Sequence, residues 1–207
     1  MQILKDEIRN KILEAAMREF KREGYAKASM REIAKAAGVT SGNIYRYFAN
    51  KEQLFDAIVI PVYEQYTARM ADMRDKIEGS YSKEAQVTPN YFRNIESAVV
   101  ELFKIYSGEL TILLIGSEGS KYENVRSELV YIAFSVLERV FIKANGSMES
   151  LNDKELALAR MLARSIVEGL CLILSDNDEG DTLAHLVDQL LFVHATGIEA
   201  LIHKSKS

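Results

Sequence analysis

Residues 30–48 read MREIAKAAGVTSGNIYRYF, with two short helix-forming segments on either side of a glycine. The pattern predicts one helix over Met30–Ala37 and a second over Ser41–Tyr47, the latter capped by Thr40. Gly38 suits the turn between them, because glycine adopts a positive φ without steric cost. Two short helices joined by a turn that contains glycine are typical of a helix-turn-helix unit.

Capping signals flank this unit on both sides. Ser29 precedes the first helix and Glu32 follows it by three residues, a spacing that predicts a capping box. Asn50 is a favourable N-cap for the next helix, and Gln53 is placed to reach back to it. Pro61 lies further along that helix and predicts a kink, because proline removes one helical hydrogen bond.

The second helix of the unit has two different faces. At 100° per residue, Ile44 and Phe48 lie within about 40° of each other and predict the side that packs on a core. A solvated surface helix is the alternative for such a segment in isolation, but the capped helix and glycine turn before it favour a DNA-reading helix. Arginine can pair with guanine, asparagine with adenine, and tyrosine hydroxyls can reach phosphates. The outward and flanking residues are Gly42, Asn43, Tyr45, Arg46 and Tyr47.

The charge is distributed unevenly along the chain. Residues 1–55 contain eleven Lys/Arg and seven Asp/Glu, a net charge of +4. The remaining residues contain fifteen and twenty-three, a net charge of −8. A basic N-terminal segment on an acidic body indicates a nucleic-acid contact at one end of the chain.

The rest of the chain also has the three- and four-residue spacing of apolar residues that predicts helices. The 207 residues include two prolines, and no alternating strand-like run stands out. We therefore expect an all-α protein of about nine helices. The first predicted helix covers Leu4–Glu23 and ends at Gly24. The fourth starts at Asn50 and ends near Ile77. The remaining five cover Asn90–Ser107, Glu109–Ile115, Tyr122–Ala144, Asp153–Ser175 and Asp181–His203.

Composition predicts a cytoplasmic protein. The N-terminus is charged too early for a signal peptide, and no apolar run approaches the roughly 18 residues that a membrane span needs. Cys171 is the only cysteine, so an internal disulfide is excluded. It lies in the apolar run LCLIL and is expected to be a buried packing residue and not a redox sensor.

The stretch Ile12–Phe55 resembles the DNA-binding domain of the TetR family of bacterial transcriptional regulators. It reads ILEAAMREFKREGYAKASMREIAKAAGVTSGNIYRYFANKEQLF, with IA..AGV, G.IY.YF and KE.L in register with the family pattern. The resemblance implies a three-helix DNA-binding domain over residues 1–50 and a helical ligand-binding and dimerisation domain over residues 51–207.

The resemblance also implies the roles of individual residues in DNA binding. Ser41, Gly42, Asn43 and Arg46 are expected nearest to the bases. The expected contacts to phosphates or groove edges are Ser29, Thr40, Tyr45, Tyr47 and Lys51.

A homodimer formed by the last two long helices is implied as well, and it predicts a palindromic double-stranded operator. The residues support this with apolar stripes that include glycines, although packing within one chain is the alternative. The expected interface residues are Leu158, Leu162, Ser165, Ile166, Gly169, Ile173, Leu183, Val187, Leu190, Gly197 and, from the same stripe, Leu201.

A small-molecule effector is the third partner that the resemblance implies. Aromatic and methionine side chains suit an apolar pocket, although a plain core is an equal alternative for each. The candidate lining residues are Tyr63, Tyr66, Met70, Phe92, Phe103 and Tyr106.

We find no spacing that predicts catalysis, a metal site or a cofactor. His185, His194 and His203 are nine residues apart, so neighbouring histidines point to opposite faces of a helix. The expected function is therefore a DNA-binding regulator, not an enzyme, and most simply a repressor released from its operator by a ligand. The alternatives are a helical small-molecule carrier or enzyme that retains the fold, and an architectural DNA binder without sequence preference.

Overall fold

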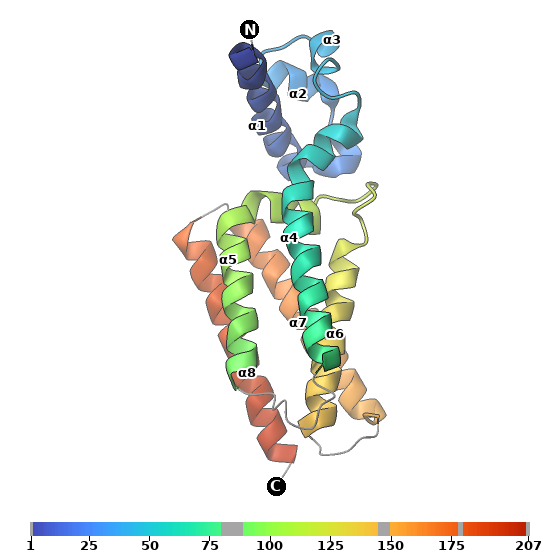
Figure 1. Cartoon of the computed structure of the whole chain (residues 1–207), viewed down its shortest axis with the longest axis vertical. Coiled ribbons are helices and arrows are strands. Elements are labelled where there is room, and N and C mark those ends of the chain that lie inside the picture. Colours follow the sequence, from blue (N-terminus) through green and yellow to red (C-terminus); the bar gives the residue numbers. More distant parts are fainter. Residues whose placement is uncertain (1, 80–88, 145–149, 178–179, 206–207) are drawn as a thin grey trace. The chain divides into compact units, whose positions relative to one another are not determined.

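The prediction of an all-α protein is confirmed. The computed structural model describes residues 2–79, 89–144, 150–177 and 180–205, and this part of the chain contains eight helices and no strand (Figure 1). The helices are α1 Gln2–Lys27, α2 Met30–Ala36, α3 Ser41–Ile44, α4 Lys51–Gly79, α5 Pro89–Leu114, α6 Val125–Ala144, α7 Asp153–Asp176 and α8 Asp181–Ser205.

The difference between nine predicted helices and eight observed ones arises in α5. The sequence predicts two helices there, separated near Ser107 and Gly108. In the structure α5 consists of two helices that meet at a kink, where Tyr106 has the non-helical angles φ −123° and ψ 29°. The predicted break is therefore present at Tyr106, next to the expected end at Ser107, and the two numbers of helices differ only in whether α5 is divided at this kink.

Gly24 interrupts the first helix at the position where the sequence predicts its end. Its φ is 72° and its ψ 166°, and a further helical turn follows it up to Lys27. The other helices end within a few residues of their predicted ends. Helix α3 ends at Ile44, and turns continue the coil to Tyr47, its predicted end. Helix α6 begins at Val125, and Tyr122 lies in the preceding turn.

Pro61 lies inside α4, and the helix continues beyond it to Gly79. The residue is exposed, so its ring can be accommodated on the outside of the helix. The predicted kink at this position stays a prediction.

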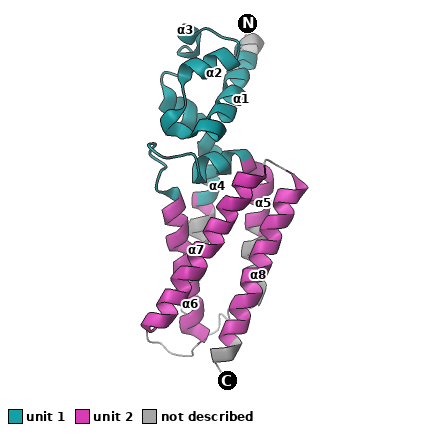
Figure 2. Ribbon diagram, turned by 180° about the vertical axis from the view of Figure 1, so that it is seen from behind, with its two compact units in different colours: residues 1–66, 108–125 teal, residues 67–107, 126–207 magenta. Residues whose placement is uncertain are grey.

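The chain divides into two compact units, which Figure 2 distinguishes by colour. Unit 1 contains Met1–Tyr66 and Gly108–Val125, and unit 2 contains Thr67–Ser107 and Arg126–Ser207. The segment from Gly108 to Val125 therefore packs with the N-terminal helices although it is distant from them in sequence. The functional division at residue 50 stays a prediction.

Unit 1 is held together by a cluster of aromatic rings. The ring of Phe55 meets those of Phe20 and Tyr25 edge-on, with centroids 4.9 and 4.8 Å apart. Tyr122 joins the cluster from the second segment, with its centroid 6.0 Å from Phe55 and 5.0 Å from Tyr63. Such pairs contribute about 0.5–1.5 kcal/mol each beyond the area they bury.

Unit 2 has a core formed by the facing sides of α6, α7 and α8. Gly169 of α7 lies opposite Leu190 of α8, and a Cβ at Gly169 would approach the leucine side chain to 2.9 Å. This glycine therefore permits close packing of two helices within one chain. The buried members of the core cluster are Val136, Leu137, Val140, Phe141, Leu151, Ala159, Ala163 and Ile198.

None of the helices in the described ranges combines the length and the hydrophobicity required to cross a bilayer.

Candidate nucleic-acid interface

The start of α2 is fixed by a carboxylate from α1. Ser29 occupies the N-cap position, but its side chain makes no capping hydrogen bond, so the predicted capping box with Glu32 is wrong. Instead, the Ser29 backbone N–H donates to Oε1 of Glu19 at 3.4 Å. The other oxygen of this buried carboxylate accepts from Arg22 at 2.6 Å. A long-range acceptor thus replaces the local one, which sequence spacing alone does not reveal.

The turn after α2 is closed by two backbone hydrogen bonds. The Gly38 N–H donates to the Lys35 carbonyl at 3.1 Å, and the Val39 N–H donates to the Ala34 carbonyl at 2.9 Å. This pair of bonds is the Schellman arrangement, which requires a left-handed residue at the glycine position. Gly38 has φ 70°, and open space surrounds its Cβ position, so conformation and not space requires glycine here.

Helix α3 is short but its direction is well determined. Thr40 caps it as predicted, with Oγ1 accepting from the Asn43 N–H at 3.2 Å. The helix ends at Ile44, three residues before the predicted end, and turn hydrogen bonds continue the coil as far as Phe48. The early end follows from the tighter bonds of this turn, since the Tyr47 N–H donates to the carbonyl three residues back, at Ile44.

The predicted orientation of this helix is confirmed. Ile44 is 0% exposed and Phe48 is 4% exposed, so both anchor the segment in the core. Tyr45 is 52% exposed and Arg46 is exposed beside it. Among the other predicted contact residues, Thr40, Ser41 and Gly42 are exposed, and Ser29, Asn43 and Tyr47 are half-buried.

Lys51 differs from the other candidates because its side chain binds the protein itself. The ammonium donates to the carbonyls of Tyr25, Ala26 and Ala28, at 2.6, 3.2 and 3.3 Å. It also lies 4.6 Å from the centroid of the Tyr25 ring. Three acceptors match the three protons of the ammonium, and the positive charge lies where α1 ends and helix carbonyls are exposed.

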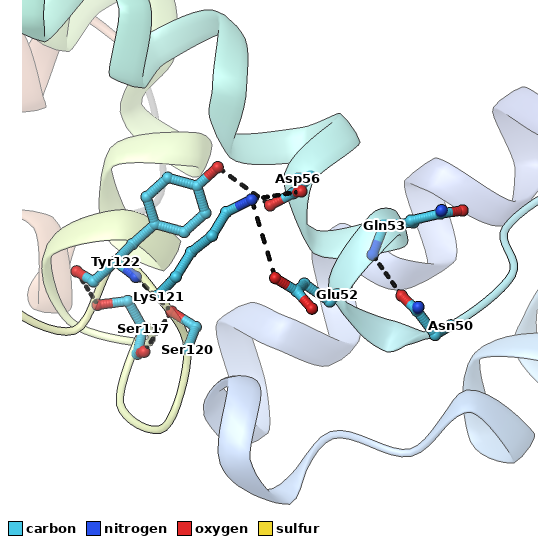
Figure 3. Close-up of polar contacts among 8 residues, drawn as sticks. All are labelled: Asn50, Glu52, Gln53, Asp56, Ser117, Ser120, Lys121 and Tyr122. Atoms are coloured by element: carbon cyan, nitrogen blue, oxygen red, sulfur yellow. Dashed lines mark hydrogen bonds and ion pairs between the residues drawn. The ribbon is translucent and has the colours of Figure 1, made fainter.

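The cap of α4 forms close to the prediction (Figure 3). Oδ1 of Asn50 accepts from the Gln53 N–H at 2.8 Å. Oε1 of Gln53 accepts from the Ala49 N–H at 3.1 Å, one residue earlier than expected. The two bonds fix the entry of the chain into α4 directly after the turns that follow α3.

A second polar cluster, not predicted from the sequence, ties the segment after α5 to α4 (Figure 3). The ammonium of Lys121 lies 2.7 Å from Oδ2 of Asp56 and 3.9 Å from Oε1 of Glu52. The Tyr122 hydroxyl donates to Oδ1 of Asp56 at 3.0 Å. Burial, and then the hydrogen bond to Asp56, raise the pKa of Tyr122 to about 12. The hydrogen bond to Asp56 also raises the pKa of Lys121.

Two glycines bring this segment against α1. The Tyr25 N–H, next to Gly24, donates to the Gly116 carbonyl at 2.7 Å. A Cβ at Gly116 would lie 3.3 Å from the Phe20 carbonyl oxygen and 3.2 Å from that of Ile112. Gly116 therefore permits a close approach of backbones. The sequence suggests only a loop here, because neither contact is local.

The residues predicted to line a ligand pocket are distributed over both units. In unit 1, Tyr66 is buried, and Tyr63 is half-buried with its ring centroid 6.3 Å from that of Tyr66. In unit 2, Phe103 is buried and Tyr106 is half-buried. The side chains of Met70 and Phe92 lie outside the described residues. The pocket stays a prediction.

The predicted dimer residues of α7 and α8 divide into three groups. Leu183 and Val187 are fully buried within the protomer. Ser165 and Gly197 are exposed, and the hydroxyl of Ser165 lies 3.1 Å from Nε2 of His194. The half-buried group contains Leu158, Leu162, Ile166, Gly169, Ile173 and Leu190.

Several large apolar side chains on α7 and α8 are exposed, and among them only Leu201 belongs to the predicted interface residues. On α8, Val193 is 64% exposed, and it shares a helical stripe with Leu186, Gly197 and Leu201. Open space surrounds the Cβ position of Gly197. The exposed apolar residues of the two helices are Met161, Leu172, Leu186, Phe192, Val193 and Leu201.

Comparisons with known proteins agree on the N-terminal region. The model of the family described as "Bacterial regulatory proteins, tetR family" matches residues 12–58. The HTH-type transcriptional regulator TtgR of Pseudomonas putida is 38% identical over 74 residues, which are 35% of each chain. The HTH-type transcriptional regulator UidR of Escherichia coli is 30% identical over 129 residues, 62% of this chain and 60% of UidR.

A solved structure extends the likeness to the fold of the whole chain. The crystal structure of a TetR family transcriptional regulator from Chloroflexus aurantiacus matches with a TM-score of 0.55 at 16% identity, covering 97% of this chain and 92% of that one. In sequence, the chain spans 35% of the length of TtgR and 60% of the length of UidR. The family match over residues 12–58, the helix-turn-helix geometry and these relatives together show that the N-terminal region is a helix-turn-helix domain of the TetR type.

Proposed function

We propose that this protein is a transcriptional repressor that binds a palindromic DNA operator as a homodimer and is released by a small-molecule ligand. The observation that carries the proposal is the orientation of α3. Its apolar residues Ile44 and Phe48 are buried, while Arg46 and Tyr45 are exposed on the other side. A helix anchored in this way presents its polar face to the major groove.

Each exposed or half-buried polar group of this surface has a chemical role in this proposal. Arg46 pairs with a guanine and Asn43 with an adenine, since these side chains match the donor and acceptor patterns of those bases. Gly42 leaves room for the backbone to approach. Phosphates are bound by the hydroxyls of Tyr45 and Tyr47. The hydroxyls of Ser29, Thr40 and Ser41 are further donors to the DNA.

Lys51 has a modified role in the proposal. Its ammonium stabilises the end of α1, so a phosphate contact at this position falls to the backbone N–H groups in the first turn of α4. The N-terminus of a helix favours an anion, because these N–H groups have no partner within the helix.

The dimer is supported by the exposed apolar stripe of α8 around Val193 and Gly197. Two copies of a chain that pack through such stripes bury the apolar area and relate two reading helices by one two-fold axis.

The ligand part of the proposal rests on the family resemblance and on the aromatic residues of α4 and α5. Ligand binding shifts the dimer away from its DNA-binding state only if the ligand prefers the other state.

The test is the affinity of the Arg46→Ala variant for duplexes that the wild-type protein selects from a random library. We expect a loss of about 1–3 kcal/mol on selected duplexes, with relaxed discrimination at one base pair per half-site. Arg18→Ala is the matched control, because Arg18 is also exposed in unit 1 and lies on the side of α1 away from the core. Equal weakening on every sequence would show that Arg46 contacts only the DNA backbone, and no weakening would exclude α3 as the reading helix.

A further inference from the structure

Helix α1 begins well before the region that defines the family. The family model matches from residue 12, whereas α1 starts at Gln2, so nearly three turns of helix precede the match. Figures 1 and 2 both show this N-terminal part of α1 extending to the end of unit 1 that carries α3. A duplex that docks on α3 therefore meets the first turns of α1 as well.

Arg9 connects these turns to the reading helix. Its guanidinium carbon lies 5.4 Å from the centroid of the Phe48 ring, and Phe48 is the buried anchor that directly follows the α3 turn. Arg9 is itself exposed. An aromatic ring attracts the positive charge of a guanidinium without using its N–H donors, which remain available to phosphate oxygens.

Lys5 extends the basic surface by one turn. It lies four residues before Arg9, within about 40° of it around the helix, and it is exposed. The exposed Asp6 lies about 60° from Arg9 on one side, and Glu7 lies on the far side at about 160°. The strip that Lys5 and Arg9 form thus carries two positive charges next to the reading helix.

We propose that Lys5 and Arg9 form a phosphate clamp that binds the DNA backbone beside the half-site read by α3. The proposal rests on the proposed DNA-binding function and adds a contact surface outside the family's helix-turn-helix match. The clamp carries no base recognition, because both side chains act through charge and Arg9 is held by its stack on Phe48. It strengthens binding to every sequence and fixes the register of α3 in the groove.

The test compares the double variant Lys5→Gln/Arg9→Gln with the wild-type protein on two probes. One is a duplex selected from a random library by the wild type, and the other is a scrambled duplex of equal length. We expect the affinity of the variant for both probes to fall by a similar factor, at least about tenfold at 0.1 M salt. For a dimer that loses four phosphate contacts, the slope of log K against log salt falls by about 3.6.

Lys11→Gln is the control for charge alone. Lys11 is exposed on the same helix but lies about 160° away from Arg9, so it faces away from Phe48. Arg9→Lys separates charge from stacking, and we expect it to retain most of the salt slope. Thermal unfolding of each variant identifies any loss of DNA affinity that arises because the variant is less stably folded.

The outcomes separate the two proposals. If the wild type enriches no duplex from the library and does not bind the scrambled duplex, the proposed DNA-binding function fails. If the wild type binds and the double variant has the affinity and salt slope of Lys11→Gln, the clamp is refuted while the proposed function stands. A loss confined to the selected duplex would also refute the clamp, because it would assign base recognition to these residues.

Discussion

At the scale of residues, the protein uses several polar side chains for structure where the sequence predicts other roles. Lys51 is the clearest case, because the family pattern marks it as a DNA contact and the structure directs its ammonium to three carbonyls of unit 1. Asp56 also has a structural role, for which the sequence makes no prediction, since it accepts from both Lys121 and Tyr122. Partners distant in sequence determine these roles, so residue type and spacing do not reveal them.

Tyr122→Phe tests the hydrogen bond that Tyr122 donates to Asp56. The ring keeps its place among Phe55 and Tyr63, so only the hydroxyl is lost. We expect the free energy of unfolding to fall by about 1 kcal/mol at pH 7, measured by urea denaturation. Tyr131→Phe, at an exposed tyrosine of α6, is the control and should leave stability unchanged.

The same variant has a signature at high pH. The folded protein raises the pKa of Tyr122 from its ordinary value of 10 to about 12, so folding favours the neutral phenol. The resulting stability is present below pH 10 and is lost as the pH rises towards about 12. The wild type should lose stability more steeply than Tyr122→Phe over this window. Parallel curves would contradict the assignment of this pKa shift to Tyr122.

At the scale of elements, most helices could be predicted from the sequence because their signals are local. Apolar spacing and the Asn152 cap define α7, and its capping box with Glu155 is present in the structure. The exceptions depend on tertiary contacts. Glu19 of α1 replaces the local cap of α2. The reading face of α3 was predictable from Ile44 and Phe48, whereas the packing of residues 108–125 into unit 1 was not.

Gly116→Ala tests the close packing between this segment and α1. The new methyl group would lie 3.2–3.3 Å from two carbonyl oxygens, both backbone atoms that cannot rotate away. We expect a destabilisation of about 1–3 kcal/mol in urea denaturation. Gly42→Ala is the control, because Gly42 has open space around it and lies in a helix, where alanine is favoured by up to about 1 kcal/mol. Equal stability of the two variants would contradict the close approach at Gly116.

At the scale of the whole molecule, the account requires a dimer. Val193→Asp places a charge on the exposed stripe of α8, where two copies are proposed to pack. A charge buried without a partner is costly, so we expect the dimer dissociation constant to rise by about 100-fold or more. Analytical ultracentrifugation measures this directly. Tyr131→Asp is the control, because it alters an exposed apolar residue of α6, and this variant should remain dimeric. If the Val193→Asp variant remains dimeric too, the interface does not lie on this stripe.

The most direct test of the central claim is selection of duplexes from a random library by the wild-type protein at near-physiological salt. The account predicts a two-fold symmetric motif, with half-sites about 34 Å or a multiple of that distance apart, because each protomer presents one reading helix. Enrichment of no motif, or of one without symmetry, by a folded dimer would contradict the proposal that this protein reads a palindromic operator.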